Sequence, residues 1–253
     1  MIVLVTGASS GIGRELARLF ARDGHDLVLA ARSQERLTAL AGELEERHRV
    51  SVRVVVCDLA QPGSAARLMD EVGRVDALVN NAGFGSSAPL VDVDIEVLTE
   101  LLEVNVVALT QLTRLALPGM VERGYGYVLN VSSTAAFQPG PGAATYYASK
   151  SYVLSFTEAV RLEVQGTGVH VTALCPGATA TGFAERAGSA HSRLFSSQVL
   201  DAAFVAREGY AGMLADRGVV IPGAMHHVAA RLAQFSPHAV TARFAQRANQ
   251  SGS

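Results

Sequence analysis

The chain of 253 residues is almost without lysine, since Lys150 stands against twenty arginines. Because arginine supplies nearly every other cation, the exception suggests chemistry that arginine cannot perform. The arginine side chain is a flat, permanently charged fork, whereas the lysine ammonium is a compact charge whose pKa responds to burial. Residues 146 to 150 read Tyr-Tyr-Ala-Ser-Lys. On a helix, Tyr146 and Lys150 would therefore lie one turn apart on the same face.

Other scarce features exclude whole classes of protein. The two cysteines, Cys57 and Cys175, each follow an apolar run, which indicates reduced thiols and a cytoplasmic protein rather than a disulfide framework. No apolar run is long enough to span a membrane, and the start at residues 1 to 5 runs into a glycine turn, so it predicts a strand rather than a signal peptide. A net charge of −2 without a basic stripe gives nucleic-acid binding no electrostatic support.

Short β-branched runs alternate with amphipathic stretches, in a chain that is 49% apolar. This alternation predicts an α/β protein: one doubly wound parallel sheet of about seven strands with helices on both faces. The predicted strands are Ile2–Thr6, Asp26–Ala31, Val52–Cys57, Ala77–Asn80, Gly126–Val131, Val169–Cys175 and Gly218–Ile221. The predicted helices include Ile12–Asp23, Gln34–Arg47, Ser64–Val72, Ile95–Glu122 and Tyr146–Gln165. Ligands bind such sheets at the carboxyl ends of the strands.

A glycine-rich turn follows the first predicted strand and precedes the first predicted helix. Such a turn lets the backbone approach a pyrophosphate, which rests on the positive helix N-terminus. Its candidate cofactor-binding residues are Gly7, Ser9, Ser10, Gly11, Ile12 and Gly13. The second strand ends at Ala31 and Arg32, where an NAD site usually offers a carboxylate to the ribose. An uncharged residue beside a guanidinium suits a 2′-phosphate, so NADP is favoured over NAD. Alternatively, Arg32 is simply solvated.

The pair of Tyr146 and Lys150 predicts a proton donor. A tyrosine has a pKa of about 10, and donating near neutral pH needs a reduction of roughly 4 kcal/mol. A cation at ~5 Å contributes about 3 kcal/mol, while burial of the phenol acts in the opposite direction. The alternative is an ordinary surface pair.

Further motifs follow in a fixed order, and with them the chain resembles a short-chain dehydrogenase/reductase of the 250-residue kind over roughly residues 2 to 222. They are the TGxxxGIG turn at 6 to 13, Cys57-Asp58-Leu59, Asn80-Asn81-Ala82-Gly83, Asn105, Asn130-Val131-Ser132-Ser133, Tyr146 with Lys150, and Pro176-Gly177 with Thr181. The resemblance implies a single-domain Rossmann fold, a catalytic set of Asn105, Ser133, Tyr146 and Lys150, and no metal. The family's spacing selects Ser133 over Ser132 and Tyr146 over Tyr147.

The resemblance also implies a role for each of these residues. Ser133 would hold the substrate oxygen, Tyr146 would protonate it, and Lys150 would lower the pKa of Tyr146 and grip the nicotinamide ribose. Asn105 would use a helix irregularity to hold a water in a proton relay. Asp58 would accept from the adenine amino group, with Leu59 beside it, although a strand-ending Asp is often a helix cap.

Two further segments would complete the cofactor site. Asn81, Ala82 and Gly83 would form a floor under the adenine ribose, unless they are ordinary loop residues. The segment after the sixth strand would close over the nicotinamide through Pro176, Gly177, Thr179 and Thr181. Thr181 could equally cap a following helix.

The expected domain spans residues 1–222 and includes a substrate lid at about 181–200. The lid carries Arg186, His191 and Arg193, which could meet an anionic tail or face water. A helical extension of the same domain is expected over 223–248, as two amphipathic helices, Met225–Phe235 and Ala239–Gln246, joined at Ser236-Pro237. It could cover the pocket, pack on a second subunit or touch a membrane, and packing within the protein is favoured because the basic face is too sparse for a strong anchor. Residues 249–253 are expected to be disordered.

The predicted function is an NADP(H)-dependent oxidoreductase that interconverts a mainly apolar ketone or aldehyde and its alcohol. The expected partners are a small-molecule substrate and further copies of the chain, as a homodimer or homotetramer. The alternative is a non-catalytic NADP-binding sensor on the same fold. A sensor needs the glycine turn but has no need of a tuned phenol, so the intact Asn, Ser, Tyr and Lys set favours the enzyme.

Overall fold

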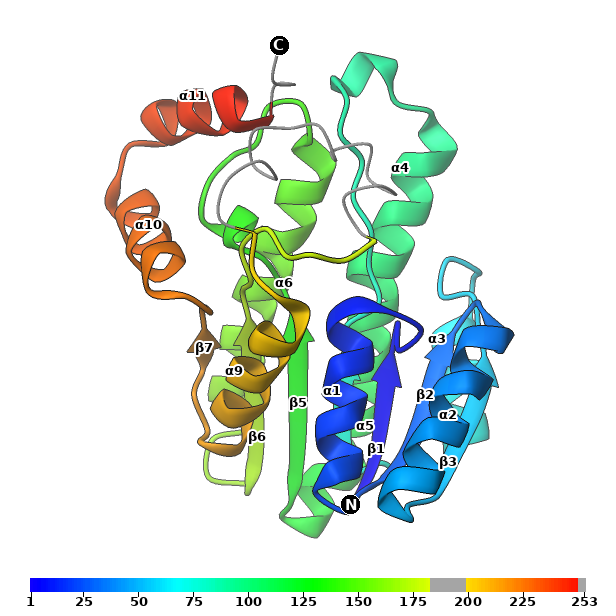
Figure 1. The fold of residues 1–253 in the computed structure, drawn as a ribbon. Helices are drawn as coiled ribbons and strands as arrows, with labels where there is room; N and C mark the ends of the chain where they lie inside the picture. Colours follow the sequence, from blue (N-terminus) through cyan, green and yellow to red (C-terminus); the bar gives the residue numbers. More distant parts are fainter. Residues whose placement is uncertain (183–198, 250–253) are drawn as a thin grey trace.

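The computed structural model describes residues 1–182 and 199–249 and shows an α/β fold in which strands and helices alternate (Figure 1). Its centre is a parallel sheet of seven strands in the order β3-β2-β1-β4-β5-β6-β7. The strands are β1 (Ile2–Thr6), β2 (Asp26–Ala31), β3 (Val52–Val56), β4 (Ala77–Asn80), β5 (Gly126–Val131), β6 (Val169–Leu174) and β7 (Val219–Val220). This order confirms the predicted doubly wound sheet. Since β1 pairs with β4, the direction of winding reverses between them, which is where such folds bind ligands.

Helices cover both faces of the sheet. On one face, Leu16 and Phe20 of α1 (Gly11–Arg22) share a buried cluster with residues of α2 (Gln34–His48) and α9 (Ala202–Leu214). On the other face, Leu112 and Met120 of α5 (Leu109–Arg123) share a second cluster with residues of α3 (Ser64–Val72) and α6 (Ala144–Glu163). Both clusters include strand residues, so the sheet is buried on both sides. This explains why its strands read as continuous apolar runs.

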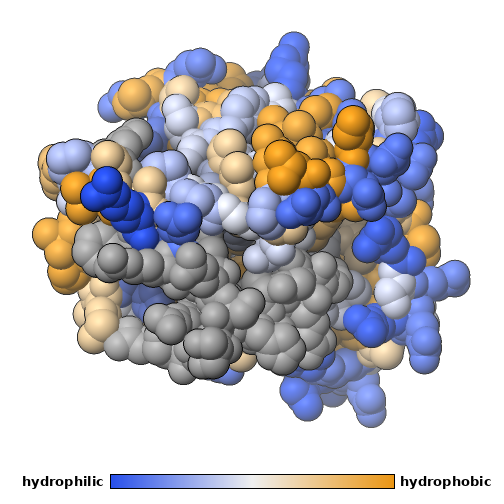
Figure 2. Space-filling model, turned by 90° about the horizontal axis from the view of Figure 1, so that it is seen from above, coloured by the Kyte–Doolittle hydropathy of each residue, from blue (hydrophilic) through white to orange (hydrophobic). Residues whose placement is uncertain are grey.

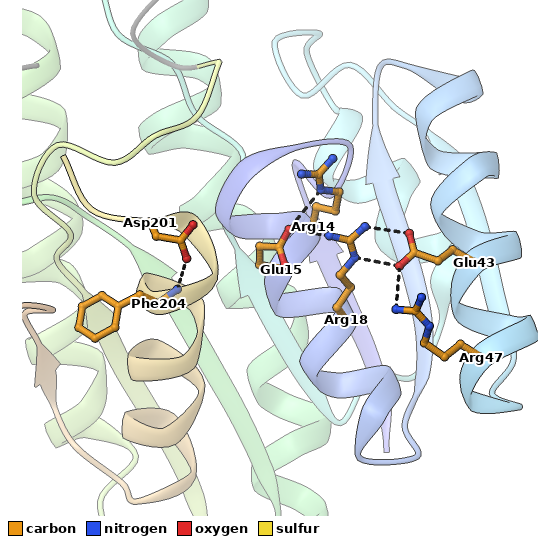
Figure 3. A network of polar contacts seen from close by, with 7 residues as sticks. All are labelled: Arg14, Glu15, Arg18, Glu43, Arg47, Asp201 and Phe204. Atoms are coloured by element: carbon orange, nitrogen blue, oxygen red, sulfur yellow. Dashed lines mark hydrogen bonds and ion pairs between the residues drawn. The ribbon is translucent and has the colours of Figure 1, made fainter.

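Ion pairs join the first two helices across their outer surface (Figure 3). The guanidinium of Arg18 on α1 donates to both carboxylate oxygens of Glu43 on α2, at 3.0 and 2.8 Å, and to Glu15 at 2.8 Å. Arg47 adds a longer contact to Glu43 at 3.7 Å. Bidentate pairs of this kind fix orientation as well as adding energy, so they hold α1 and α2 in register.

Several elements differ from the sequence-based expectation. The stretch predicted as one helix over 95 to 122 is divided into α4 (Ile95–Leu102), a π-helical segment η2 (Glu103–Ala108) and α5. Strands β3, β6 and β7 end one residue short of their predicted limits, although Cys57 and Cys175 still donate backbone hydrogen bonds to neighbouring strand residues. Helix α9 was absent from the expected elements.

The C-terminal extension forms the two expected helices, α10 (Ala224–Phe235) and α11 (His238–Asn249), joined at Ser236 and Pro237. Helix α11 includes Asn249, the first residue of the segment expected to be disordered, and residues 250–253 lie outside the described chain. Ala245 of α11 is buried against Ala135, Ala143 and Tyr147. The extension therefore packs on the rest of the domain. Within the described ranges, no helix has the length and apolar character needed to cross a membrane.

Candidate active site

A cavity of about 770 Å³ runs along the carboxyl ends of the strands. It is lined by nearly all of the site residues predicted from the sequence. These are Gly7, Ser9, Ser10, Gly11, Ile12, Arg32, Asp58, Leu59, Asn81, Ala82, Gly83, Ser133, Tyr146, Lys150, Pro176, Gly177, Thr179 and Thr181. Two predicted residues, Gly13 and Asn105, are absent from its lining. The fold therefore brings segments from seven parts of the chain to one edge of the sheet.

The glycine turn after β1 is held open by Asn81. The side-chain amide of Asn81 donates to the carbonyls of Thr6 at 3.0 Å and Gly7 at 3.2 Å. Gly7 has a φ of 65° and Gly11 a φ of 56°, in the left-handed region that favours glycine. Gly13 lies beneath the turn, where a side chain would overlap the Asn81 amide and the Gly7 carbonyl. Gly13 is thus closely packed beneath the turn, and its predicted contact with a cofactor stays a prediction.

At the end of β2, the cavity meets two guanidinium groups rather than one. Arg32 lines it together with Ser33 and Arg36, and Ser33 is the N-cap residue of α2. Arg36 lies four residues beyond Arg32, just inside the first turn of α2. Ser33 and Arg36 were not among the residues predicted from the sequence, although a second arginine at the start of a predicted helix was a usable signal.

The loop after β3 also lines the cavity through Asp58 and Leu59. One carboxylate oxygen of Asp58 accepts a hydrogen bond from the Ala60 amide at 3.1 Å, and the other accepts from the Gln61 side chain at 3.4 Å. Asp58 therefore organises its own loop while its side chain faces the site.

Ser133, Tyr146 and Lys150 meet at the opposite end of the cavity, near β5. Ser133 is the N-cap of the short helix η3 (Thr134–Phe137), where its hydroxyl accepts from the Ala135 amide at 3.1 Å. The hydroxyls of Ser133 and Tyr146 form a side-chain hydrogen bond. The Lys150 ammonium lies 5.8 Å from the centre of the Tyr146 ring and donates to the Val131 carbonyl at 2.9 Å.

The two neighbouring residues, Ser132 and Tyr147, also line the cavity, but each is held by a contact of its own. Ser132 is buried, and its hydroxyl donates to the backbone carbonyl of Lys150 at 2.8 Å. The Tyr147 ring packs against Gly140, where any side chain would overlap it. This geometry favours Ser133 and Tyr146 as the pair that faces one reacting group.

The pKa values of this cluster differ from the expectation. Burial raises the pKa of Tyr146 to about 12, and the hydrogen bond from Ser133 only partly opposes the rise. Burial also lowers the pKa of Lys150 to about 8. The expected reduction of the Tyr146 pKa by Lys150 is therefore not what the structure shows. The physical reason is that loss of hydration disfavours the charged form of both groups and is the largest influence on each pKa.

Asn105 acts behind the cavity wall. It lies in the π-helical segment η2, so the predicted helix irregularity is present. Its side chain accepts from the Phe84 amide at 3.1 Å and donates to the Phe84 carbonyl at 2.9 Å and to Ser149 at 3.1 Å. Ser149 in turn donates to the Tyr146 carbonyl at 2.7 Å. Asn105 thus connects the loop after β4 to the helix that carries Tyr146.

The loop after β6 closes the site. The Pro176 carbonyl accepts from the Thr134 amide at 2.9 Å and from the Ser133 hydroxyl at 3.4 Å, which ties this loop to η3. Thr181 reaches over Gly11, where an added Cβ would lie 2.8 Å from the Thr181 methyl carbon.

The described ends of the expected lid are fastened together. Ala180 and Leu200 join through a backbone hydrogen bond of 2.8 Å, and a second of 2.8 Å runs from Leu200 to Ala178. The predicted lid residues Arg186, His191 and Arg193 lie outside the described residues. Across residues 1–182 and 199–249, no three His, Cys, Asp or Glu side chains gather as metal ligands would.

Comparisons with known proteins agree with this geometry. A family model described as short chain dehydrogenase matches residues 1–192. Sulfoacetaldehyde reductase 2 of Chromohalobacter salexigens is 42% identical over 188 residues, which cover 72% of this chain and 74% of that protein. The NADP-dependent 3-hydroxy acid dehydrogenase YdfG of Escherichia coli (strain K12) is 38% identical over 178 residues, 70% of this chain and 72% of that protein.

The solved structures give the same result over most of the chain. A short-chain dehydrogenase from Sphingobium yanoikuyae in complex with NADPH superimposes with a TM-score of 0.84 at 36% identity, covering 91% of this chain and 90% of that one. The fold of this chain is thus shared with a solved short-chain dehydrogenase. The chain belongs to the short-chain dehydrogenase family and is an oxidoreductase.

Proposed function

We propose that the protein is an NADP(H)-dependent carbonyl reductase acting on a neutral, mainly apolar ketone or aldehyde. The observation that carries the proposal is the single cavity that joins the glycine turn and the arginines of β2 to the Ser133, Tyr146 and Lys150 cluster. A dinucleotide bound along that edge, with its adenine end beside the arginines, would have its nicotinamide near the Ser133 and Tyr146 hydroxyl groups.

The β2 end of the cavity supports NADP rather than NAD. Ala31, Arg32, Ser33 and Arg36 line it, and none of them is a carboxylate that would pair with two ribose hydroxyls and repel a phosphate. Two guanidinium forks and a hydroxyl suit a 2′-phosphate through charge-assisted hydrogen bonds.

The mechanism follows from the three side chains near β5. When bound, the reduced nicotinamide supplies a hydride to the carbonyl carbon. Ser133 donates a hydrogen bond to the carbonyl oxygen, and Tyr146 gives that oxygen its proton. Lys150 holds its charge beside the phenol and stabilises the phenolate left behind. A phenol with a raised pKa stays protonated until the developing alkoxide, a stronger base, takes the proton.

The substrate class is inferred from the cavity wall near Tyr146. Its side chains include Ser86, Thr134, Ala135, Gln138 and Ala143, all of them neutral. Among the described residues, the cations that line the cavity are Lys150 in the catalytic cluster and the two arginines near β2. A sulfonate or carboxylate would therefore meet no dedicated cation on these walls.

Incubation with NADPH and two sets of carbonyl compounds tests the proposal. Neutral ketones and aldehydes should cause loss of the reduced-cofactor absorbance, faster than aldehydes that carry a sulfonate or carboxylate. Preference for the charged set would overturn the substrate class. Tight NADPH binding with no turnover of either set would instead support the rival function, a nucleotide sensor.

A further inference from the structure

Helix α10 of the C-terminal extension lies behind the loops that carry the catalytic groups. It packs on η3, the short helix capped by Ser133. His226, in its first turn, places its imidazole ring against Gly177, where any side chain would overlap the ring. Gly177 itself lines the active-site cavity. One glycine therefore separates a residue of the extension from the site.

The ring of His226 is confined on its second side as well. Gly223, the N-cap of α10, has a φ of 84°, and an added Cβ there would lie 3.2 Å from the imidazole Nδ1. His226 is partly buried, and its burial lowers its pKa, so the ring is neutral at pH 7. Among the described residues, its imidazole makes no hydrogen bond. Its contacts are therefore steric, with the backbone of two glycines.

The backbone that His226 supports leads directly to the catalytic serine. Pro176 precedes Gly177, and its carbonyl accepts from the Thr134 amide and from the Ser133 hydroxyl. A shift of Gly177 toward α10 would draw this carbonyl away from both donors. Ring, glycine, carbonyl and serine thus form one continuous chain of contacts.

We propose that His226 is a positioning residue, which holds the Pro176–Gly177 backbone in place and through it orients Ser133 and the cofactor end of the cavity. The inference rests on the proposed function for its catalytic readout. It assigns the C-terminal extension a part in the reaction. It also explains why position 177 is glycine: the loop and the imidazole occupy adjoining space with no room for a methyl group.

The first test compares His226→Ala with His227→Ala, its exposed neighbour on the same helix. We expect His226→Ala to lower kcat at least tenfold and to weaken NADPH binding severalfold, while His227→Ala matches the parent enzyme. His226→Gln, which nearly conserves the volume, should recover most of both losses. Thermal unfolding of each variant shows whether a loss merely follows from lower stability.

The second test uses the contact itself. Gly177→Ala should reduce NADPH affinity by pushing the loop away from His226, and adding His226→Ala should restore part of it, because the smaller side chain leaves room for the methyl group. The double variant then binds better than the sum of the two single effects predicts. Strictly additive effects, or a His226→Ala enzyme equal to the parent in kcat and NADPH affinity, would overturn the inference.

Failure of the proposed reductase function can be told apart from failure of the His226 proposal. If the parent protein binds NADPH but reduces no carbonyl compound, the reductase proposal fails. The coupling between positions 177 and 226 is still measured from NADPH affinity.

Discussion

Tyr146 and Lys150 are both desolvated by burial, which favours the neutral form of each side chain. Lys150 is 6% exposed, and among the described residues its ammonium donates a hydrogen bond to the Val131 carbonyl alone. Desolvation disfavours an ammonium and a phenolate alike, so the pKa of the lysine falls and that of the tyrosine rises. The sequence showed that the two groups are neighbours but not how deeply they are buried.

The lowered pKa of Lys150 makes folding stability depend on pH. With a folded pKa of about 8 and an unfolded value of about 10.4, the unfolded chain binds more protons between these values, so stability rises with pH across that window. Between pH 7 and pH 9.5, the parent protein should gain about 2 kcal/mol in free energy of unfolding relative to Lys150→Met. Urea unfolding of both proteins at the two pH values measures this difference. Tyr146 and Cys175 are present in both, so their titrations cancel. If the difference in free energy of unfolding between the two proteins is the same at both pH values, burial does not lower the pKa of Lys150.

Removing the phenol oxygen should separate chemistry from binding. Tyr146→Phe is expected to lose about 10²- to 10⁴-fold in kcat, the contribution of a positioned general acid, with NADPH affinity nearly unchanged. Tyr147→Phe, which keeps its ring against Gly140, should lose far less. Steady-state kinetics and NADPH titration of the two variants give the comparison. If Tyr147→Phe is the inactive variant, the assignment of the proton donor is wrong by one residue.

At the scale of elements, the long helix before β5 shows what hydrophobic periodicity hides. Residues 95 to 122 read as one helix, whereas the structure inserts the π-helical segment η2 at Asn105. One extra residue in a helical turn barely alters an apolar pattern. It does free a side chain to bond elsewhere, and Asn105 uses this freedom for Phe84 and Ser149. The family resemblance predicted a helix irregularity at Asn105, but only the tertiary structure identified the hydrogen-bond partners of its side chain.

The junction of β2 and α2 should determine cofactor choice. Replacing Arg32 and Arg36 by Ala is expected to raise the KM for NADPH by about 10- to 100-fold, the loss of two charge-assisted hydrogen bonds, and to leave the KM for NADH nearly unchanged. Arg47→Ala, at the far end of the same helix, is the matched control. Kinetics with both cofactors measure the ratio. An equal rise for NADPH and NADH would mean that the arginines support the fold rather than recognise the phosphate.

Across the whole molecule, apolar side chains are exposed in separate places. Viewed from above, hydrophobic residues gather on the side of the molecule that carries α4 (Figure 2). The exposed apolar residues there include Leu90, Val91 and Ile95. Further exposed apolar residues occupy α6, where Leu162 is 70% exposed, and α10, where Phe235 is 84% exposed. These surfaces are candidates for contact with other copies of the chain.

The predicted homodimer or homotetramer pairs through the long helices near Asn105 and Tyr146. If so, a substitution on α6 should disrupt it and one on α10 should not. Leu162→Arg on α6 should lower the molar mass measured by light scattering during gel filtration, because a charge would be buried at the helix pair. Phe235→Arg on α10 should leave it unchanged. Dissociation by Phe235→Arg alone would assign the interface to the C-terminal extension instead.

The sequence by itself determined the alternation of strands and helices, the parallel sheet and a set of candidate site residues, nearly all of which line the cavity. It could do so because buried parallel strands leave continuous apolar runs, and because glycine turns and the Tyr146–Lys150 spacing are local patterns. Only the tertiary structure decided the direction of the pKa shifts, the packing role of Gly13, the entry of Arg36 into the cavity and the contact of His226 with Gly177. Each of these depends on burial or on groups far apart in the chain, which local spacing does not encode.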